Sequence, residues 1–326
     1  MKKDSNNHRK QYTLSELIDY YEVCNRAEGK SPRTVGFYSA NLKHFLSYLK
    51  KRHLSELVDK IDIRLLREYA ICLHKEKKYS GHPYTPEGSG PISVSTVHGH
   101  VRTLRAFFNW LVREGIRSEH VARELKPPKL CRKVISTLSD EEIRVILKTF
   151  DSSTSNDIRN QTLFMLLLDT GLRIGEVVKL TMDNMNLDQG FMKVLGKGNK
   201  ERVVPFGSSA QRALQRYLFR FRPKAANPVI TNVFLSIAGT PLTENAVKLL
   251  FTRLAHISGV SRLHAHLCRH TFATKFLVNG GDVFSLQQIL GHSTLEMVRH
   301  YVNLASNHVV MQHQKFSPLD RLNLRK

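Results

Sequence analysis

Apolar residues recur at helical spacing through the first third of the chain. From Thr13 onward Leu, Ile and Tyr return every three or four positions, after a Thr-Leu-Ser-Glu capping box. The same spacing predicts helices over residues 31–52, 63–73 and 93–114, the first with a proline in its first turn. In the last of these we expect His98 and His100 to lie outside the core. The pattern indicates an all-helical bundle.

Two stretches rich in Pro, Gly or basic residues interrupt this periodicity. Residues 79–91 are typical of an exposed loop. The segment around Lys126-Pro-Pro-Lys129 is typical of an extended linker, and a second capping box, Ser139 to Glu142, follows it. We therefore predict a helical domain over 1–118, a linker over 119–136, and a second domain over 137–326 with a tail from about residue 303.

The second region combines helices with one pair of strands. Apolar and polar residues alternate over 191–195 and 202–206, on either side of a Gly- and Lys-rich tip, which predicts a β-hairpin. The predicted helices cover 140–150, 159–169, a short run from about residue 172, 208–221, 243–258, 269–279 and 283–290. The expected fold class is mainly α with a small antiparallel β-sheet.

The charge of the chain bears on its partner. Its 326 residues include 50 Lys and Arg against 28 Asp and Glu, a formal charge of +22. Such a surplus predicts a polyanionic partner. Basic residues are spread over both halves and no apolar run approaches the ~20 residues that span a bilayer, which favours nucleic acid over a membrane. Because no signal peptide pattern follows the N-terminus, we expect a cytoplasmic protein.

Cysteine and histidine spacing gives little support to a metal site. The four cysteines lie far apart without a CxxC pair. His266 and His270 are spaced to share one helical face, but Leu267 stands where a zinc protease of the HExxH type has its Glu. We therefore expect no metal and no cofactor.

Three short motifs carry candidate chemistry, and each has an ordinary structural alternative. Arg173 and Glu176 are three apart after a helix-breaking glycine, so the carboxylate could orient the guanidinium or form a plain surface ion pair. The hairpin tip 196–201 is basic but lacks the P-loop pattern. Tyr301 could be a nucleophile with His292 as its electrostatic partner, or the two could be a packed ring and a helix cap.

Five separated segments resemble, in order, the motifs of the tyrosine recombinases, also called the phage integrase family. The resemblance covers essentially the whole chain and is closest to the simple Xer-like recombinases. It implies an N-terminal SAM-like core-binding domain and a C-terminal catalytic domain that clamp DNA. The matching segments are Thr170-Gly-Leu-Arg-Ile-Gly-Glu176, Gly196-Lys-Gly-Asn-Lys-Glu-Arg202, His266-Leu-Cys-Arg-His270, Leu290-Gly-His292 and Tyr301.

The resemblance also implies roles in phosphoryl transfer. Tyr301 would attack a DNA phosphodiester and form a 3′-phosphotyrosyl bond. Arg173 and Arg269 would hold the phosphate oxygens, with Glu176 supporting Arg173. His266 is favoured as general base and His292 as a hydrogen-bond donor, although the two roles could be exchanged. A lysine of the hairpin tip would protonate the leaving 5′-oxygen, and Lys197 is favoured over Lys200 for that role.

The implied enzyme is a site-specific recombinase that cuts and rejoins DNA strands without metal or ATP. Its partners would be double-stranded recombination sites and further copies of the chain, a dimer on one site and a tetramer in the synapse, with a partner recombinase an open possibility. The C-terminal tail would dock either on its own domain or on a neighbour. Integration, excision and resolution of a mobile element, plasmid or replicon dimer all remain open. The alternatives are a nicking-closing enzyme like the type IB topoisomerases and a catalytically idle DNA-binding protein.

Overall fold

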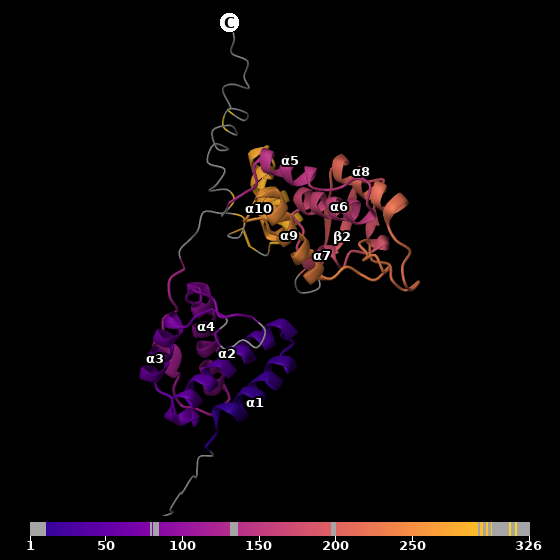
Figure 1. The fold of residues 1–326 in the computed structure, drawn as a ribbon. Helices are drawn as coiled ribbons and strands as arrows, with labels where there is room; N and C mark the ends of the chain where they lie inside the picture. Colours follow the sequence, from indigo (N-terminus) through magenta and orange to yellow (C-terminus); the bar gives the residue numbers. More distant parts are fainter. Residues whose placement is uncertain are drawn as a thin grey trace, which may run out of the picture. The chain divides into compact units, whose positions relative to one another are not determined.

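The computed structural model describes residues 11–78, 80, 85–130, 136–196 and 200–292, together with 294, 295, 298, 301, 313 and 317. These residues form two compact units that divide between positions 133 and 134 (Figure 1). The predicted hairpin tip falls partly, and the predicted tail almost wholly, outside the described residues.

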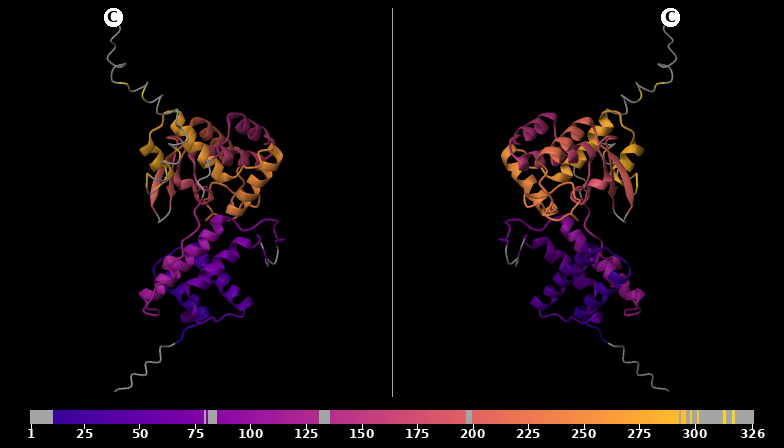
Figure 2. Two further views of the ribbon diagram at one scale, coloured as in Figure 1. Left: turned by 90° about the vertical axis from the view of Figure 1, so that its left-hand side faces the viewer. Right: turned by 90° about the vertical axis from the view of Figure 1, so that its right-hand side faces the viewer.

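The described residues of the first unit form four α-helices, as the apolar pattern predicts. Each begins at a side chain that accepts a hydrogen bond from the first helical turn, which satisfies amides that have no partner within the helix. Apolar stripes of all four pack into one core. Figure 2 shows the helices of this unit from two further sides. The helices are α1 (Leu14–Ala27), α2 (Pro32–Lys51), α3 (Ile63–Lys75) and α4 (Val94–Arg113).

The prediction that His100 lies outside this core is wrong. His100 is buried, because it is three residues after Val97 and four before Leu104 on the inward face of α4. Its Nδ1 forms a 3.1 Å hydrogen bond with the hydroxyl of the buried Tyr69. This bond explains how the core accommodates a polar ring at that position.

The segment predicted as linker also needs a correction at its start. Val121–Glu124 forms a short 3-10 helix, and Ala122 and Leu125 are buried in the core of the first unit. Two apolar side chains three positions apart are thus enough to hold this stretch on the helical unit. Residues 131–135 of the predicted linker lie outside the described part of the chain.

The second unit is mainly helical and carries a small sheet. Two helices begin earlier than predicted, since α6 starts at Ser155 and α10 at Ala265, and the final turn before Arg222 is π-helical over Tyr217–Phe221. The α-helices are α5 (Asp140–Lys148), α6 (Ser155–Thr170), α7 (Ile174–Val177), α8 (Ser208–Arg216), α9 (Glu244–Ser258), α10 (Ala265–Val278) and α11 (Val283–Leu290).

The described strands form one antiparallel sheet in the order β1-β2-β3. The predicted hairpin is present as β2 (Phe191–Leu195) and β3 (Glu201–Pro205), and the two-residue β1 (Met185–Asn186) adds an edge that the pattern did not indicate. Strand β3 contacts α11, and α10 packs against both α6 and α11. The sheet lies at one side of the unit in both views of Figure 2. This packing brings the end of α6, β3, α10 and the end of α11 together.

Among the residues with a described position, no helix has both the length and the apolar character needed to cross a membrane.

Candidate active site

The first predicted motif lies at a sharp break between two helices. Gly171 ends α6 in the left-handed conformation (φ 62°), and α7 begins three residues later. A Cβ at Gly171 would come within 2.6 Å of Phe272 and 2.8 Å of Leu290, so the turn leaves no room for a side chain. Arg173 stands at the N-cap of α7. Its backbone amide donates to Glu176 Oε2 at 2.9 Å, and its Nη1 donates to Oε1 at 3.0 Å.

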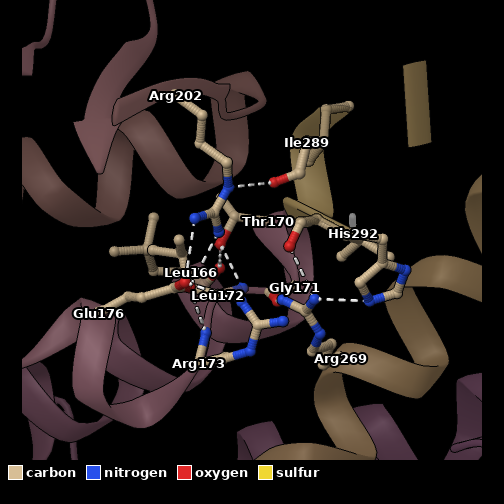
Figure 3. Close-up of polar contacts among 11 residues, drawn as sticks. Leu166, Thr170, Gly171, Leu172, Arg173, Glu176, Arg202, Arg269, Ile289 and His292 are labelled. Atoms are coloured by element: carbon tan, nitrogen blue, oxygen red, sulfur yellow. Dashed lines mark hydrogen bonds and ion pairs between the residues drawn. The ribbon is translucent and has the colours of Figure 1, made fainter. Parts of the chain in front are cut away.

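A second arginine, for which the sequence predicted no role, shares the same carboxylate. Arg202 of β3 donates from Nη1 and Nη2 to the two oxygens of Glu176, both at 2.9 Å, and from Nε to the Ile289 carbonyl at 2.8 Å (Figure 3). A Cβ at Gly291, which also has a positive φ, would approach this side chain to 3.0 Å. Arg202 therefore ties the hairpin to both α7 and the end of α11.

Strand alternation contained a signal for this contact. Arg202 and Val204 are two positions apart on β3 and therefore face the same side of the sheet. Val204 is fully buried and Arg202 nearly so. A guanidinium at an inward position needs a buried acceptor, and a carboxylate is the strongest one.

Glu176 is ionised in spite of its burial. Burial alone would raise the pKa of this carboxyl, but hydrogen bonds from Arg202 and from the Arg173 amide, together with both positive charges, hold it below its usual value. The side chain of Glu176 is 7% exposed. The side chains of its two partners are 37% exposed for Arg173 and 11% exposed for Arg202. Arg173 is thus held at its backbone amide and at Nη1, while 37% of its side chain stays exposed.

Arg269 is the most buried charged side chain of the site, with 1% of its surface exposed. It sits in the second turn of α10 and donates from Nη1 to the Gly171 carbonyl at 2.7 Å and from Nη2 to the Leu290 carbonyl at 2.8 Å. Burial and the neighbouring charge of Arg173 lower its pKa to about 10, which leaves it charged at neutral pH. Within the described residues its hydrogen-bond partners include no carboxylate.

His292 lies beside Arg269 in the turn that follows α11. Its Nε2 is 2.9 Å from Arg269 Nη2, and because a guanidinium can only donate, Nε2 must be the acceptor. Burial and the nearby charge of Arg269 lower the pKa of His292 to about 4, so the ring is neutral and carries its proton on Nδ1. That Nδ1 is buried and has no hydrogen-bond partner among the described residues. It is a free donor inside the site.

Tyr301 comes close to these residues from beyond the turn. Its ring is 4% exposed, packs with Ala273, Leu277 and Leu286, and lies parallel to the His292 ring with centroids 6.3 Å apart. Burial raises the pKa of the Tyr301 phenol, and the charges of Arg269 and Arg173 oppose this shift. The side chains of the residues on either side of Tyr301 are outside the described structure.

The hydroxyl of Tyr301 is hydrogen-bonded to His270, whose spacing in the sequence suggested only a metal ligand. His270 Nδ1 is 2.8 Å from the hydroxyl. His266, one turn earlier on α10, contacts the His270 ring edge to face at a centroid distance of 4.4 Å. Burial and the charge of Arg269 lower the pKa of His266. The helical spacing of the two histidines was visible in the sequence, but their contact with Tyr301 was not.

Of the two candidate lysines of the hairpin tip, Lys200 lies among the described residues and Lys197 does not. Lys200 is exposed, and its carbonyl accepts a 2.9 Å hydrogen bond from the Gly196 amide at the base of the tip. In the part of the chain that is described, no group of three or more His, Cys, Asp or Glu side chains is arranged to hold a metal ion.

Comparisons with known proteins place this site in a family. The phage integrase family model matches residues 136–308, and the phage integrase SAM-like domain model matches 14–126. Tyrosine recombinase XerD of Staphylococcus aureus is 30% identical over 304 residues, 93% of this chain and 98% of the relative. XerD of Listeria innocua is 30% identical over 309 residues, covering 94% and 99% of the two chains.

Solved structures share the fold at lower identity. XerH bound to palindromic difH substrate, in a post-cleavage complex, has a TM-score of 0.69 at 22% identity over 94% of this chain and 85% of its own. The Tn1549 transposon integrase in complex with transposon right end DNA has a TM-score of 0.70 at 19% identity, covering 89% and 94% of the two chains.

The chain belongs to the phage integrase family, and its catalytic unit is a tyrosine recombinase domain. It is a site-specific tyrosine recombinase close to the Xer proteins. The predicted family, fold class and enzyme class are confirmed, and the comparisons give no support to the topoisomerase-like or idle alternatives.

Proposed function

We propose that this cluster binds one phosphodiester of duplex DNA and that Tyr301 attacks it. The observation that carries the proposal is an unbalanced charge. The carboxylate of Glu176 pairs with the guanidiniums of Arg173 and Arg202, while the guanidinium of Arg269 beside them binds two backbone carbonyls and His292. The three arginines and one carboxylate leave a surplus of two positive charges (3 − 1). Such a surplus in a partly buried site calls for an anionic ligand. A phosphodiester beside the partly exposed Arg173 supplies it.

The proposed chemistry has to overcome the weak nucleophilicity of a phenol. With a pKa near 10 a tyrosine is a weak nucleophile at neutral pH, and the negative charge of a diester repels it further. Arg173 and Arg269 would neutralise the non-bridging oxygens, and the free Nδ1–H of His292 would donate to one of them. Attack would join Tyr301 to the 3′-phosphate and release a 5′-hydroxyl. Religation needs no ATP, since the phosphotyrosine keeps the bond energy.

The leaving 5′-oxygen needs a proton, and we assign this to the hairpin lysines. Lys197 stays the preferred donor because it occupies the family's position in the motif, with Lys200 as the competitor. Arg202 supports the assignment indirectly, because it anchors strand β3, which leads directly out of the tip, to Glu176.

Double-stranded DNA is the proposed partner of both units. The two solved structures with the same fold contain bound DNA, and the charge of +22 on this chain favours binding to a polyanion. Affinity for a non-cognate duplex should fall by about a thousandfold or more between roughly 50 and 200 mM salt, since each neutralised phosphate releases counterions. Titration by fluorescence anisotropy at several salt concentrations measures this. A flat response would mean that the positive charge does not serve DNA binding.

We further propose that copies of the chain assemble on DNA, two on one site and four in the synapse. We assign the docking site for the tail of another copy to an apolar cavity of about 400 Å³ that lies between α5, α6, α8 and α10. Its lining includes Leu147, Phe164, Leu168, Phe272 and Phe276.

Deletion of the chain after residue 306 tests this assembly. Recombination between two sites should drop by at least about tenfold, the loss expected when roughly 1.4 kcal/mol of interprotomer contact is removed, while binding to one site should change little. Native mass measurements on one-site and two-site DNA would report the stoichiometry. Equal losses in both assays would instead place the tail on its own domain.

The biological role is a separate proposal. Integration or excision of a mobile element and resolution of plasmid or replicon dimers are equally compatible with the site, and the similar proteins include both Xer recombinases and a transposon integrase. A cytoplasmic location and a partner recombinase also stay predictions.

A further inference from the structure

The contact between His270 and Tyr301 has a consequence for the proposed reaction, on which this inference rests. Among the described residues, the hydrogen-bond partner of the Tyr301 hydroxyl is His270, at 2.8 Å, and not His266 or His292. Tyr301 is held in this orientation by Ala273 and Leu277 of α10, the same helix that carries His270. The phenol and this imidazole are therefore placed by one rigid element.

We propose that His270, through Nδ1, is the group that accepts the phenolic proton when Tyr301 attacks DNA. The Tyr301 oxygen would form a bond to phosphorus as the bond from phosphorus to the 5′-oxygen breaks. The phenolic proton would pass to His270, and the 5′-oxygen would take its proton from the hairpin lysine. In religation both protons return, so the imidazole and the lysine are restored in each complete cycle.

The two other histidines, His266 and His292, have different neighbours. Burial lowers the pKa of His266, and so do the nearby charges of Arg269 and Arg173, the arginines that would hold the phosphate. His292 uses Nε2 to accept from Arg269 and keeps its proton on Nδ1. The acceptor nitrogen of His292 is thus already used by Arg269, and the described residues show no hydrogen bond between the phenol and His266. His270 offers an acceptor nitrogen to the phenol when its own proton is on Nε2.

The positive groups around His270 would make its basicity depend on whether DNA is bound. Burial, with His266, His264 and Arg269 nearby, lowers its pKa to about 4, so the ring is neutral and able to accept at neutral pH. Before DNA binds, the surrounding positive charge makes an imidazolium unfavourable, and the phenol keeps its proton. A phosphodiester beside the arginines would cancel part of that charge and stabilise the imidazolium, raising the basicity of His270 when it is needed.

The test compares single-turnover cleavage by histidine variants of the full chain. The probe is a nicked duplex carrying the sequence that the protein selects from a random pool, so that the short 5′-hydroxyl fragment leaves and the covalent adduct accumulates. In His270→Asn the amide stands near the position of Nδ1 and can hold the phenol, but it cannot take a proton. The adduct rate should fall by about 100-fold, the lower range for a lost general base, with duplex affinity unchanged.

Three readouts separate proton transfer from mere positioning. The wild-type cleavage rate should rise with pH as the base is deprotonated. This rising limb of the pH–rate profile should flatten in His270→Asn. Added imidazole should restore part of the rate in His270→Ala. The exposed His256, in the last turn of α9, gives the matched control, and His256→Asn should cleave like the wild type. If His270→Ala fails to fold, thermal unfolding will show it and the Asn variant carries the test.

The inference is overturned if His270→Asn cleaves within threefold of the wild type, or if it keeps the same pH limb. It is equally overturned if His266→Asn, and not His270→Asn, loses that limb, which would make His266 the base. If the wild-type chain forms no adduct at all, the proposed function fails instead, and the two failures are distinguishable.

Discussion

Replacing Tyr301 with phenylalanine should abolish covalent attachment to DNA, a loss of at least about 10⁴-fold, because no other group replaces a missing nucleophile. Duplex affinity should stay within about twofold. The phenyl ring fills the same apolar space beside Ala273 and Leu277, and only the hydrogen bond to His270, worth about 1 kcal/mol, is lost. A detergent-resistant protein-DNA band on a nicked site is the measurement.

Tyr217 provides the control for this substitution. It is also buried in the second unit, and its hydroxyl accepts a hydrogen bond of 3.2 Å from the Leu235 amide. Tyr217→Phe should therefore cost similar stability while still forming the adduct. If Tyr301→Phe formed the band as well, the nucleophile would have to be another residue.

Glu176→Gln should lower the cleavage rate by about 100-fold, the effect expected when catalytic groups shift by about 1 Å. The amide keeps the shape of the carboxylate but places a donor where Arg202 or Arg173 now donates. Unfolding free energy should fall by about 3 kcal/mol, because a buried guanidinium loses its ionic partner. Cleavage kinetics together with denaturant unfolding would measure both effects.

A similar ion pair outside the site separates this effect from a general loss of charge. Glu142 receives two hydrogen bonds from Arg262, at 2.6 and 2.7 Å, but this arginine is 43% exposed. Glu142→Gln should change stability by less than about 1 kcal/mol and leave cleavage unaltered. Equal effects of the two substitutions would contradict the role given to Glu176.

Local patterns were sufficient to predict most helices. The capping box at Thr13, the proline at the start of α2 and the Gly that ends α6 each act over a few residues, and each is present as expected. Helix α11 has the predicted bounds, Val283–Leu290. The pairing of Arg173 with Glu176 was predictable for the same reason, since the two lie one helical turn apart.

Such local patterns could not predict contacts between segments that are distant in the sequence. Arg202 reaches Glu176 across 26 residues (202 − 176) and the Ile289 carbonyl across 87 (289 − 202), and only strand alternation gave a hint that its side chain points inward. His270 meets Tyr301 because Tyr301 packs against α10, which no local spacing indicates. The early start of α10 also mattered. It places His266, Arg269 and His270 on one continuous helix.

The central claim is that Tyr301 becomes joined to DNA, and mapping the attached residue tests it most directly. The wild-type chain would be trapped on the nicked duplex, digested with protease and nuclease, and analysed by tandem mass spectrometry. We predict a nucleotide 3′-phosphate on the peptide that contains Tyr301, linked to that phenol. A nucleotide on any other residue, or on a 5′-phosphate, would contradict the account.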